Sequence, residues 1–349
     1  MNPVRFAIIG TGSIAAKHAQ AIASVPGAIL VAVWGRDVSR GRAFASQYGV
    51  EFVTDLSALA ARPDIDAATI ATPSGFHELP TLAFLRSGKA VLCEKPLEIT
   101  LEKINNMLEI SRAHHAPLAC IFQRRLGAGA LAMKHAVEQG RFGRLTLCGA
   151  YLKWWRDQAY YDTVAWRGTR ELDGGGAMMN QGIHAVDLLQ WLVGMPEQVF
   201  AFGGQLAHER IEVEDTMVVS LKFPNGALGV IEAATSCKPG AAMRIELCGD
   251  KGSAVLEDDV ITRWQFDEEW TEDESIRKMR TSLMGGGAGD PMAITTEGHR
   301  LLVEDFVSAI REQRPPMIPG AEAVNAVRLI LASYQSAAEG RSVRVADVG

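Results

Sequence analysis

Three short stretches of the 349-residue chain combine residue types that could do chemistry. The first, GTGSIA at residues 10–15, has the glycine spacing of a loop that holds a dinucleotide pyrophosphate. The second, EKP at residues 94–96, could place an ammonium beside a reacting oxygen. The third, NQGIHAVD at residues 180–187, contains an imidazole that could accept a proton near neutral pH. Cofactor binding, charge stabilisation and proton transfer are therefore the chemistries that the fold must position.

The glycine-rich stretch follows the apolar run VRFAIIG and opens a helix-like segment. Gly10 permits the tight turn, Gly12 lets the backbone approach a pyrophosphate, and Ala15 keeps the helix close to the sheet. The helix N-terminus adds N–H donors for the anion. Because another strand follows within the span of a βαβ unit, the sequence predicts a dinucleotide site rather than an ordinary tight turn.

The second predicted strand, ILVAVW, ends without the acidic residue that usually binds the adenosine ribose. Gly35 stands at that place, followed by Arg36 and Asp37. Without the carboxylate there is less repulsion of a 2′-phosphate, and Arg36 could pair with that phosphate or stack on adenine. NADP is therefore favoured over NAD. A solvated Arg36 and an Asp37 that turns inward are the alternatives.

The spacing of apolar runs along the sequence predicts two different sheets. Over the first 120 or so residues, fully apolar runs of strand length alternate with helical segments, which predicts a doubly wound parallel sheet covered on both faces. Beyond residue 143, strand-length runs separated by turn signals predict a large, mostly antiparallel open sheet in an α+β domain. Helices are expected near 175–193, 297–313 and 320–339. The predicted fold class is therefore α/β, with domains at 1–123 and 124–349.

The composition excludes several classes of protein. With 48% hydrophobic and 22% charged residues, the chain is neither disordered nor collagen-like. A net charge of −6 argues against nucleic-acid binding. The apolar runs are shorter than the roughly 20 residues of a membrane span, and no secretory signal is expected. Five scattered cysteines without a CxxC pair, and no cluster with metal-ligand spacing, predict a cytoplasmic protein without structural zinc or disulfides.

The motifs GTGSIA, ATPSGFH at 71–77, EKP and GGGAMMNQGIHAVDLLQWLVG together resemble the Gfo/Idh/MocA family of NAD(P)-dependent sugar dehydrogenases. The resemblance covers nearly the whole chain, up to the closing YQSAAEGRSV. It implies an N-terminal Rossmann domain and a C-terminal domain that binds substrate and carries subunit contacts on its open sheet, in a homodimer or homotetramer. It also implies that Lys95 is catalytic, often with a cis Lys95–Pro96 bond.

The third motif departs from the family pattern at one position. Asn180 stands where members commonly have a carboxylate, and an amide cannot take up a proton at neutral pH. Proton transfer then falls to His184 or Lys95. If the stretch is helical, Asn180 and His184 share a face. Asp187 either orients the His184 ring or is a carboxylate on the helix surface, and the sequence leaves both open.

An aromatic and basic segment between the domains could bind a sugar. Aromatic faces stack on sugar C–H surfaces and Arg offers paired N–H donors, whereas packing of these aromatics in the core is the alternative. The predicted substrate contacts are Lys95, Arg156, Tyr161, Trp166, Arg167, Asn180 and His184. The predicted cofactor contacts are Gly10, Thr11, Gly12, Ser13, Ile14, Arg36, Thr72, Pro73, His77, Glu94, Lys95 and Gln123. The predicted catalytic residues are Lys95, His184 and Asn180.

The predicted reaction is hydride transfer between nicotinamide and a secondary alcohol of a sugar, inositol or sugar derivative. His184 is expected to take the hydroxyl proton and Lys95 to stabilise the alkoxide. One alternative is NAD-dependent glycoside cleavage with transient redox, and another is a non-catalytic dinucleotide sensor. The glycine-rich segment 284–291 lacks the Lys-Ser/Thr of a phosphate loop and is expected to be a flexible loop.

Overall fold

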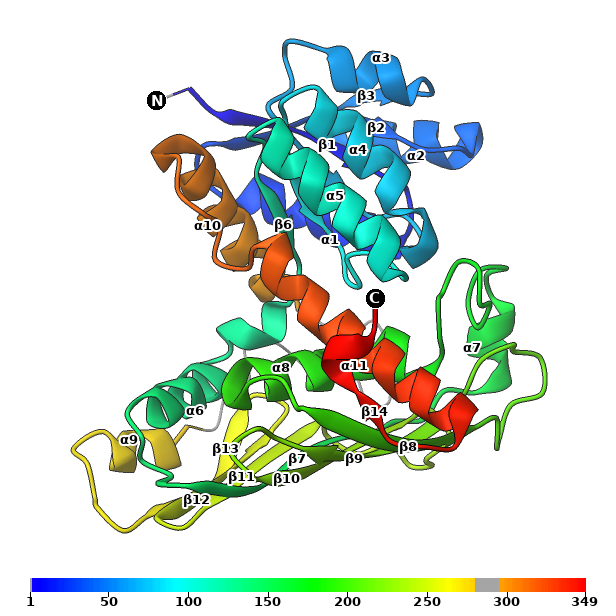
Figure 1. Cartoon of the computed structure of the whole chain (residues 1–349). Helices are drawn as coiled ribbons and strands as arrows, with labels where there is room; N and C mark the ends of the chain where they lie inside the picture. The colour runs from blue at the N-terminus through cyan, green and yellow to red at the C-terminus, as the bar shows by residue number, and fades with distance from the viewer. Residues whose placement is uncertain (1, 280–294) are drawn as a thin grey trace. The chain divides into compact units, whose positions relative to one another are not determined.

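The computed structural model describes residues 2–279 and 295–349, and the chain forms two compact units (Figure 1). The first unit consists of residues 1–122 and 296–324, and the second of residues 123–295 and 325–349. The sequence patterns predicted a single domain for residues 124–349. The structure instead gives 296–324 to the first unit, because the helix in this segment packs against the N-terminal residues.

The first unit is built on a six-stranded parallel sheet in the order β3-β2-β1-β4-β5-β6. Its central strands are buried along their whole length, which is the pattern of a sheet covered on both faces. The strands are β1 (Val4–Ile9), β2 (Ala28–Trp34), β3 (Glu51–Val53), β4 (Ala67–Ile70), β5 (Ala90–Cys93) and β6 (Leu118–Cys120). The strand order reverses between β1 and β4, and this is where such sheets bind ligands, at the carboxyl ends of the strands.

Helices cover both faces of this sheet, and Figure 1 shows α4 and α5 side by side on one of them. Right-handed crossovers place α1 and α2 on the opposite face, because the chain runs outward from β1 in one direction and from β4 in the other. The helices are α1 (Ser13–Ser24), α2 (Val38–Tyr48), α3 (Leu56–Ala61), η1 (Ser74–Phe76), α4 (Glu78–Arg86), α5 (Leu101–Ala113) and α10 (Glu297–Glu312).

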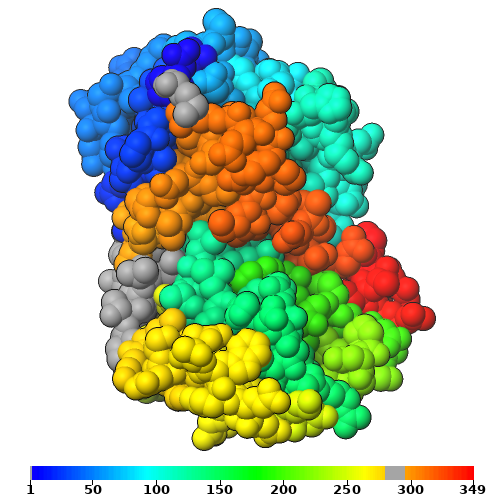
Figure 2. Space-filling view, turned by 90° about the vertical axis from the view of Figure 1, so that its left-hand side faces the viewer, coloured from blue at the N-terminus to red at the C-terminus, as the bar shows by residue number. Residues whose placement is uncertain are grey.

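The returning segment 296–324 completes the first unit. Helix α10 packs on α1, and its Arg311 donates to the Asn2 and Gly27 carbonyl oxygens. The Cys120 N–H donates to the Ile318 carbonyl oxygen, which extends the edge of the sheet. Figure 2 shows the orange atoms of this segment beside the blue atoms of the N-terminal residues. Side chains of α10 can therefore reach groups in the first unit that lie two hundred residues earlier in the sequence.

The second unit is built on an eight-stranded sheet in the order β13-β12-β11-β7-β10-β9-β8-β14. Every pair is antiparallel except β7 with β10. The strands are β7 (Leu145–Lys153), β8 (Gln198–Gly204), β9 (Thr216–Lys222), β10 (Leu228–Ala234), β11 (Arg244–Gly249), β12 (Gly252–Glu257), β13 (Val260–Phe266) and β14 (Val343–Arg344). Strict alternation of buried and exposed residues along β9 shows one packed face and one open face.

Helices pack on the closed face, with α8 against β7 and β11. The helices of this unit are η2 (Gln123–Leu126), α6 (Ala128–Glu138), α7 (Gln158–Asp162), η3 (Ala177–Gly182), α8 (Ile183–Val193), α9 (Asp273–Arg277) and η4 (Val345–Asp347), and α11 (Gly320–Glu339) spans the boundary between the units. The predicted helix near 175–193 is confirmed, but it starts as the π-helix η3 before α8 continues it. The α/β fold class, with one parallel and one mostly antiparallel sheet, is confirmed.

Across residues 2–279 and 295–349, none of the helices combines the length and apolar character needed to cross a membrane.

Candidate functional site

The turn after β1 brings three backbone segments close together. Gly10 has φ +121°, and a Cβ atom at this position would lie 2.4 Å from the Ala71 carbonyl oxygen after β4. The Gly10 N–H donates to the Trp34 carbonyl oxygen at the end of β2. Only glycine fits this crossing of strand ends.

Gly12 leaves the start of α1 open. It is the N-cap of α1, and among the described residues no side chain caps the helix and no atom outside the adjoining backbone lies within 4 Å of the place a Cβ would take. The first N–H groups of α1 are therefore accessible to an anion. Of the other predicted loop contacts, Ser13 is exposed, and Thr11 and Ile14 are half-buried. This loop fits the pyrophosphate of a dinucleotide.

The end of β2 carries a basic and aromatic surface. The Arg36 guanidinium lies 5.0 Å from the centre of the Phe76 ring, and Phe76 stacks on Trp34 at 6.5 Å. Asp37 is the N-cap of α2, accepts hydrogen bonds from the Arg40 N–H and the Arg40 Nε–H, and has its pKa lowered by them. Its carboxylate is thus used locally, whereas Arg36 remains exposed.

The ends of β4 and β5 are tied together by His77. Its Nδ1 lies 2.8 Å from the Pro96 carbonyl oxygen and its Nε2 lies 2.9 Å from the Thr72 carbonyl oxygen. Burial lowers the pKa of His77, so the neutral ring donates to one of these carbonyls at a time. The peptide bond between Lys95 and Pro96 is cis. His77 therefore fixes the two loops, 72–77 and 94–96, that carry most of the remaining predicted cofactor contacts.

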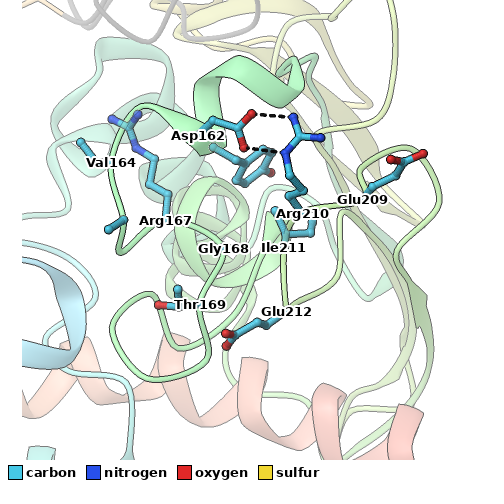
Figure 3. Close-up of a pocket in the computed structure, with 11 residues that line it drawn as sticks. Asp162, Val164, Arg167, Gly168, Thr169, Glu209, Arg210, Ile211 and Glu212 are labelled. Carbon is cyan, nitrogen blue, oxygen red and sulfur yellow. Dashed lines mark hydrogen bonds and ion pairs between the residues drawn. The ribbon is translucent and has the colours of Figure 1, made fainter.

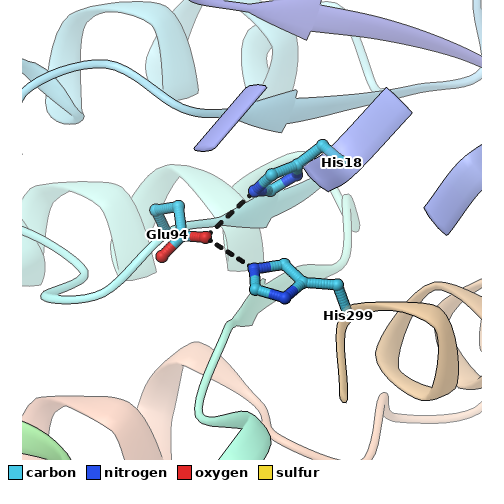
Figure 4. A group of neighbouring side chains, drawn as sticks. All are labelled: His18, Glu94 and His299. Atoms are coloured by element: carbon cyan, nitrogen blue, oxygen red, sulfur yellow. Dashed lines mark hydrogen bonds and ion pairs between the residues drawn. The ribbon is translucent and has the colours of Figure 1, made fainter. Parts of the chain in front are cut away.

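A buried cluster that no motif of the sequence indicated surrounds Glu94, the residue before Lys95 (Figure 4). His18 of α1 and His299 of α10 each place Nε2 at 3.0 Å from Glu94 Oε1. The other carboxylate oxygen of Glu94 accepts the Lys95 N–H at 3.1 Å. All three side chains of this triad are buried. The side chain of Glu94, a predicted cofactor contact, faces α1 and α10.

Hydrogen bonding explains the charge state of this triad. Burial alone raises the pKa of a carboxyl group, but the hydrogen bonds from His18 and His299 outweigh it and hold the pKa of Glu94 well below its usual range. Burial also lowers the pKa of His18. The triad is therefore a carboxylate that accepts hydrogen bonds from the Nε2 atoms of two histidines.

The same three residues are a geometric candidate for a metal site, since their ligand atoms lie within 4.8 Å of one another. Metal-bound histidines normally donate their second ring N–H to an acceptor. The Nδ1 atoms of both His18 and His299 are buried, and neither has a hydrogen-bond partner among the described residues. The arrangement therefore fits a hydrogen-bonded triad better than a metal centre.

In the second unit, a buried carboxylate holds Asn180. The Asn180 Nδ2 donates to Asp173 Oδ1 at 2.6 Å, and the Gly168 N–H donates to Asp173 Oδ2 at 2.9 Å. Asp173 is 1% exposed, whereas Asn180 is half-buried. Asn180 lies in the π-helix η3, and His184 is the second residue of α8 and is buried. Asp173 was not among the residues that the sequence analysis singled out.

A second carboxylate caps the start of this helix. Glu214 accepts the Gly176 and Met178 N–H groups, each at 2.9 Å, and the Tyr334 hydroxyl at 2.9 Å. Burial raises the pKa of Glu214, and these hydrogen bonds oppose the rise. A Cβ on Gly176 would lie 1.6 Å from the Glu214 carbonyl oxygen, so only glycine can precede η3 here. The segment that carries Asn180 and His184 is therefore rigidly placed within its unit.

Asp187 is neither exposed nor a surface carboxylate. It is 1% exposed and forms a bidentate ion pair with Arg125, with N···O distances of 2.8 and 2.7 Å. Gln190 also donates to it. The surface alternative that the sequence left open for Asp187 is therefore wrong. Gln123, two residues before Arg125, is buried, and its Oε1 has no hydrogen-bond partner among the described residues.

The aromatic and basic segment forms one connected cluster. The Arg156 guanidinium lies 5.0 Å from the Trp154 ring and 5.5 Å from the Tyr160 ring, and that of Arg167 lies 4.2 Å from Tyr160. Gln181 of η3 donates to the Tyr160 hydroxyl at 3.1 Å. Within the described part of the chain, Trp154 Nε1 and Gln181 Oε1 are buried without a hydrogen-bond partner.

Two other predicted substrate contacts are placed differently. Tyr161 is largely buried, and its hydroxyl forms a hydrogen bond with Thr235 Oγ1 at 2.7 Å. Trp166 is half-buried beside Arg167.

An open cavity of about 410 Å³ lies beside this cluster (Figure 3). Tyr161, Arg167, Gly168 and Thr169 contribute to its wall, and Arg210 closes one side through an ion pair with Asp162. Gly168 connects the cavity to Asp173 and hence to Asn180. The structure thus groups the cavity, the aromatic cluster and Asn180 in the second unit.

The predicted residues therefore fall into two groups. The glycine loop and the loops 72–77 and 94–96 gather at the strand ends of the first unit. The segment 154–187 gathers on the second. The predicted loop 284–291 lies outside the described residues. Lone histidines and a lone aspartate in the sequence carried no signal for His18, His299 or Asp173, because their partners come from distant segments.

Comparison with known proteins connects both groups to one family. Residues 4–122 match the oxidoreductase family described by an NAD-binding Rossmann fold, and residues 130–255 match the GFO/IDH/MocA C-terminal domain. The WlbA dehydrogenase of Bordetella pertussis, solved with NADH and UDP-GlcNAcA, is 32% identical, with a TM-score of 0.88 over 98% of this chain and 99% of that one.

Curated relatives align over the same full length. The inositol 2-dehydrogenase of Rhizobium meliloti (strain 1021) is 28% identical over 98% of this chain and 99% of its own. The D-glucoside 3-dehydrogenase of Escherichia coli (strain K12) is 28% identical over 99% of this chain and 98% of its own.

Proposed function

Because this chain belongs to the GFO/IDH/MocA family of oxidoreductases, we propose that it oxidises a secondary alcohol of a sugar or sugar derivative, with Lys95 and His184 as catalytic residues. The chain is an NAD(P)-dependent enzyme that acts on CH–OH groups. The observation that carries the assignment of Lys95 is its place in the first unit. It follows β5, beside the strand ends that hold the glycine loop, and Glu94 bonds both to its N–H and to α1.

The proposed chemistry divides the two hydrogens of the alcohol between different acceptors. The nicotinamide cofactor, when bound, supplies the hydride acceptor for the carbon-bound hydrogen. His184 takes the hydroxyl proton, and imidazole is suited to this near neutral pH. The Lys95 ammonium stabilises the negative charge that develops on the oxygen. The products are a ketone and the reduced cofactor.

The test replaces Lys95 with Ala. We expect turnover to fall by about a thousandfold or more, because the charge on the oxygen loses its stabilising group, while the cofactor still binds. Lys278→Ala, at an exposed lysine of the second unit that pairs with Glu274, is the matched control. Near-normal turnover of Lys95→Ala would refute the role of this residue.

We propose NADP as the preferred cofactor. Arg36 is exposed and held over Phe76, and Asp37 is committed to the start of α2, so positive charge is available where a 2′-phosphate would lie. Michaelis constants for both cofactors test this, with Arg36→Ala expected to raise the constant for NADP about tenfold and to leave that for NAD unchanged. A lower Michaelis constant of the wild type for NAD than for NADP would refute the proposed preference. Gln123, whose Oε1 has no hydrogen-bond partner among residues 2–279 and 295–349, is a further proposed cofactor contact.

For the substrate, we propose a sugar that carries negative charge. Trp154 Nε1 and Gln181 Oε1, which lack a hydrogen-bond partner in the described part of the chain, offer a donor and an acceptor for sugar hydroxyls. Arg156 and Arg167 lie within the same cluster. A UDP-linked uronic acid therefore stands first in a panel that also contains inositols, neutral aldoses and glycosides. Cofactor absorbance reports net oxidation. Glycoside cleavage without net reduction of the cofactor would indicate the alternative reaction with transient redox. Cofactor binding without turnover of any sugar would indicate a dinucleotide sensor.

We propose that copies of the chain associate through the open face of the eight-stranded sheet. Phe202 of β8 pairs with Val218 of β9, Leu228 of β10 pairs with Leu147 of β7, and all four are exposed. Their register places them on one face, and such an exposed apolar patch is typical of an interface. Light scattering should give a dimer or tetramer, and Phe202→Glu should shift it toward monomer. A cytoplasmic location, with cysteines kept as thiols, remains our proposal.

A further inference from the structure

A side chain from the glycine loop takes up the space at the end of β2. Gly35, the residue after β2, is buried, and its backbone does not lie in the left-handed region that favours glycine. A Cβ atom at this position would lie 2.9 Å from Thr11 Cγ2 and 3.3 Å from Thr11 Oγ1. Both distances are shorter than the roughly 3.5–4.0 Å at which such atoms pack well. Thr11, rather than the backbone conformation, therefore leaves no room for a side chain at position 35.

Position 35 is where this fold usually discriminates between the two nicotinamide cofactors. A carboxylate about 20 residues after the glycine loop binds the ribose 2′-hydroxyl of NAD, whereas a nearby Arg accommodates the 2′-phosphate of NADP. Position 35 lies that far beyond Ala15, the last residue of the loop GTGSIA. The next carboxylate along the chain, that of Asp37, accepts the Arg40 N–H and Nε–H groups at the start of α2. Arg36, by contrast, is exposed.

We propose that Thr11 is a specificity-determining residue, whose side chain keeps a ribose-binding carboxylate out of position 35 and leaves Arg36 to meet the 2′-phosphate of NADP. This inference rests on the proposed preference for NADP and goes beyond it, because it assigns selectivity to a residue of the pyrophosphate loop. A carboxylate at position 35 would repel the phosphate and bind the hydroxyl of NAD. Its exclusion therefore favours NADP in both ways.

A carboxylate introduced at position 35 should serve NAD only when Thr11 is shortened. With Ala at position 11, the nearest remaining atom of that side chain is its Cβ, which would lie 3.7 Å from a Cβ at position 35. This distance is an ordinary van der Waals contact. In Gly35→Asp alone, the new side chain and Thr11 compete for one space, and the glycine loop must shift. Positions 11 and 35 should therefore act as a coupled pair.

Fluorescence titrations of the full-length protein with NADPH and NADH measure this coupling without any substrate. Gly35→Asp alone should raise the dissociation constant of NADPH by at least about tenfold and that of NADH by about threefold or more. The double variant Thr11→Ala/Gly35→Asp should bind NADH at least about tenfold more tightly than Gly35→Asp does, while NADPH binding stays weak. Thr11→Val/Gly35→Asp is the matched control. Because Val fills the same space as Thr, this variant should bind both cofactors as Gly35→Asp does.

Melting temperatures without cofactor test the steric contact even if Gly35→Asp does not fold. Gly35→Ala should lower the melting temperature by about 4 °C or more, and adding Thr11→Ala should restore most of that loss. Gly41→Ala is the control, because its Cβ would overlap the Phe52 ring instead. Thr11→Ala should not restore the stability of Gly41→Ala.

The results separate this inference from the proposed cofactor preference. The inference is overturned if the effects of Thr11→Ala and Gly35→Ala on melting simply add. It is also overturned if Thr11→Ala/Gly35→Asp binds NADH no more tightly than Gly35→Asp does. A wild type that binds NADH more tightly than NADPH would refute the proposed preference for NADP and, with it, the selection of NADP by Thr11.

Discussion

Replacing Glu94 with Gln should lower both stability and turnover, because an amide cannot accept all the hydrogen bonds that Glu94 accepts in the His18–Glu94–His299 triad. The native carboxylate accepts three N–H groups, two from the imidazoles on Oε1 and one from Lys95 on Oε2. An amide has one oxygen. If that oxygen serves the histidines, its NH₂ group opposes the Lys95 N–H. If it serves Lys95, the NH₂ group opposes both Nε2–H groups.

The magnitude follows from these contacts. In either orientation, at least one hydrogen bond to a charged acceptor is lost, which costs about 1.5–3 kcal/mol, and a buried donor is left without a partner, which costs about 1–3 kcal/mol more. A loss of about 3 kcal/mol in the free energy of unfolding is the expected result. For a unit of this size, that lowers the melting temperature by about 6–12 °C.

Turnover should fall further than stability alone explains. The Lys95 N–H loses its acceptor, so the side chain that carries the ammonium is no longer held in one place. A displacement of about 1 Å at a catalytic group can cost about a hundredfold in rate. We therefore expect kcat to fall by about ten- to a hundredfold. The dissociation constant of the cofactor should change less, since the open start of α1 is formed by the backbone.

Differential scanning fluorimetry, steady-state kinetics and cofactor titration measure these three quantities. Glu98→Gln is the matched control. Glu98 is also a fully buried carboxylate of the first unit, but it pairs with Lys103 at 2.9 Å and accepts the Ile99 N–H. It should lower the melting temperature without the large loss of kcat. The reasoning fails if Glu94→Gln melts within a degree or two of the wild type, or if the two variants lose kcat equally.

Two other predictions follow from the same structure. Burial lowers the pKa of His18 and of His77, so the unfolded chain binds more protons than the folded one below about pH 6.5. The free energy of unfolding should therefore fall as the pH drops through this range, by up to about 1.4 kcal/mol per pH unit for each histidine. A melting temperature that stays constant between about pH 7.5 and pH 5 would contradict this prediction. Gly176→Ala should destabilise the second unit by at least about 3 kcal/mol, because the new Cβ would overlap the Glu214 carbonyl oxygen. Gly49→Ala, at φ +67° and with no described atom nearby, should lower the free energy of unfolding by only about 1–2 kcal/mol. If Gly49→Ala is more destabilising than Gly176→Ala, the close packing of Gly176 against Glu214 is wrong.

Local patterns predicted the two sheets because each strand carries its own signal. The fully apolar runs of β4 and β5 indicated a covered parallel sheet, and the alternation along β9 indicated an open antiparallel one. The glycine loop was predictable for the same reason, since Gly10, Gly12 and Ala15 are neighbours in the sequence. By contrast, the return of α10 to the first unit depends on tertiary contacts such as Arg311 with the Gly27 carbonyl oxygen, and no local pattern encodes those.

In the candidate site, too, some residues could be predicted from local motifs and others could not. Lys95, Asn180 and His184 stand in recognisable motifs, but the groups that hold them do not. His299 reaches Glu94 across 205 positions, and Tyr334 reaches Glu214 across 120. Each of these partners is a single His, Tyr or carboxylate whose type fits many roles. A sequence motif therefore marks the proposed catalytic group, while hydrogen bonds from distant segments hold the residues around it. Asn180 shows the consequence, because the carboxylate that binds its amide belongs to Asp173, which no motif of the sequence marks.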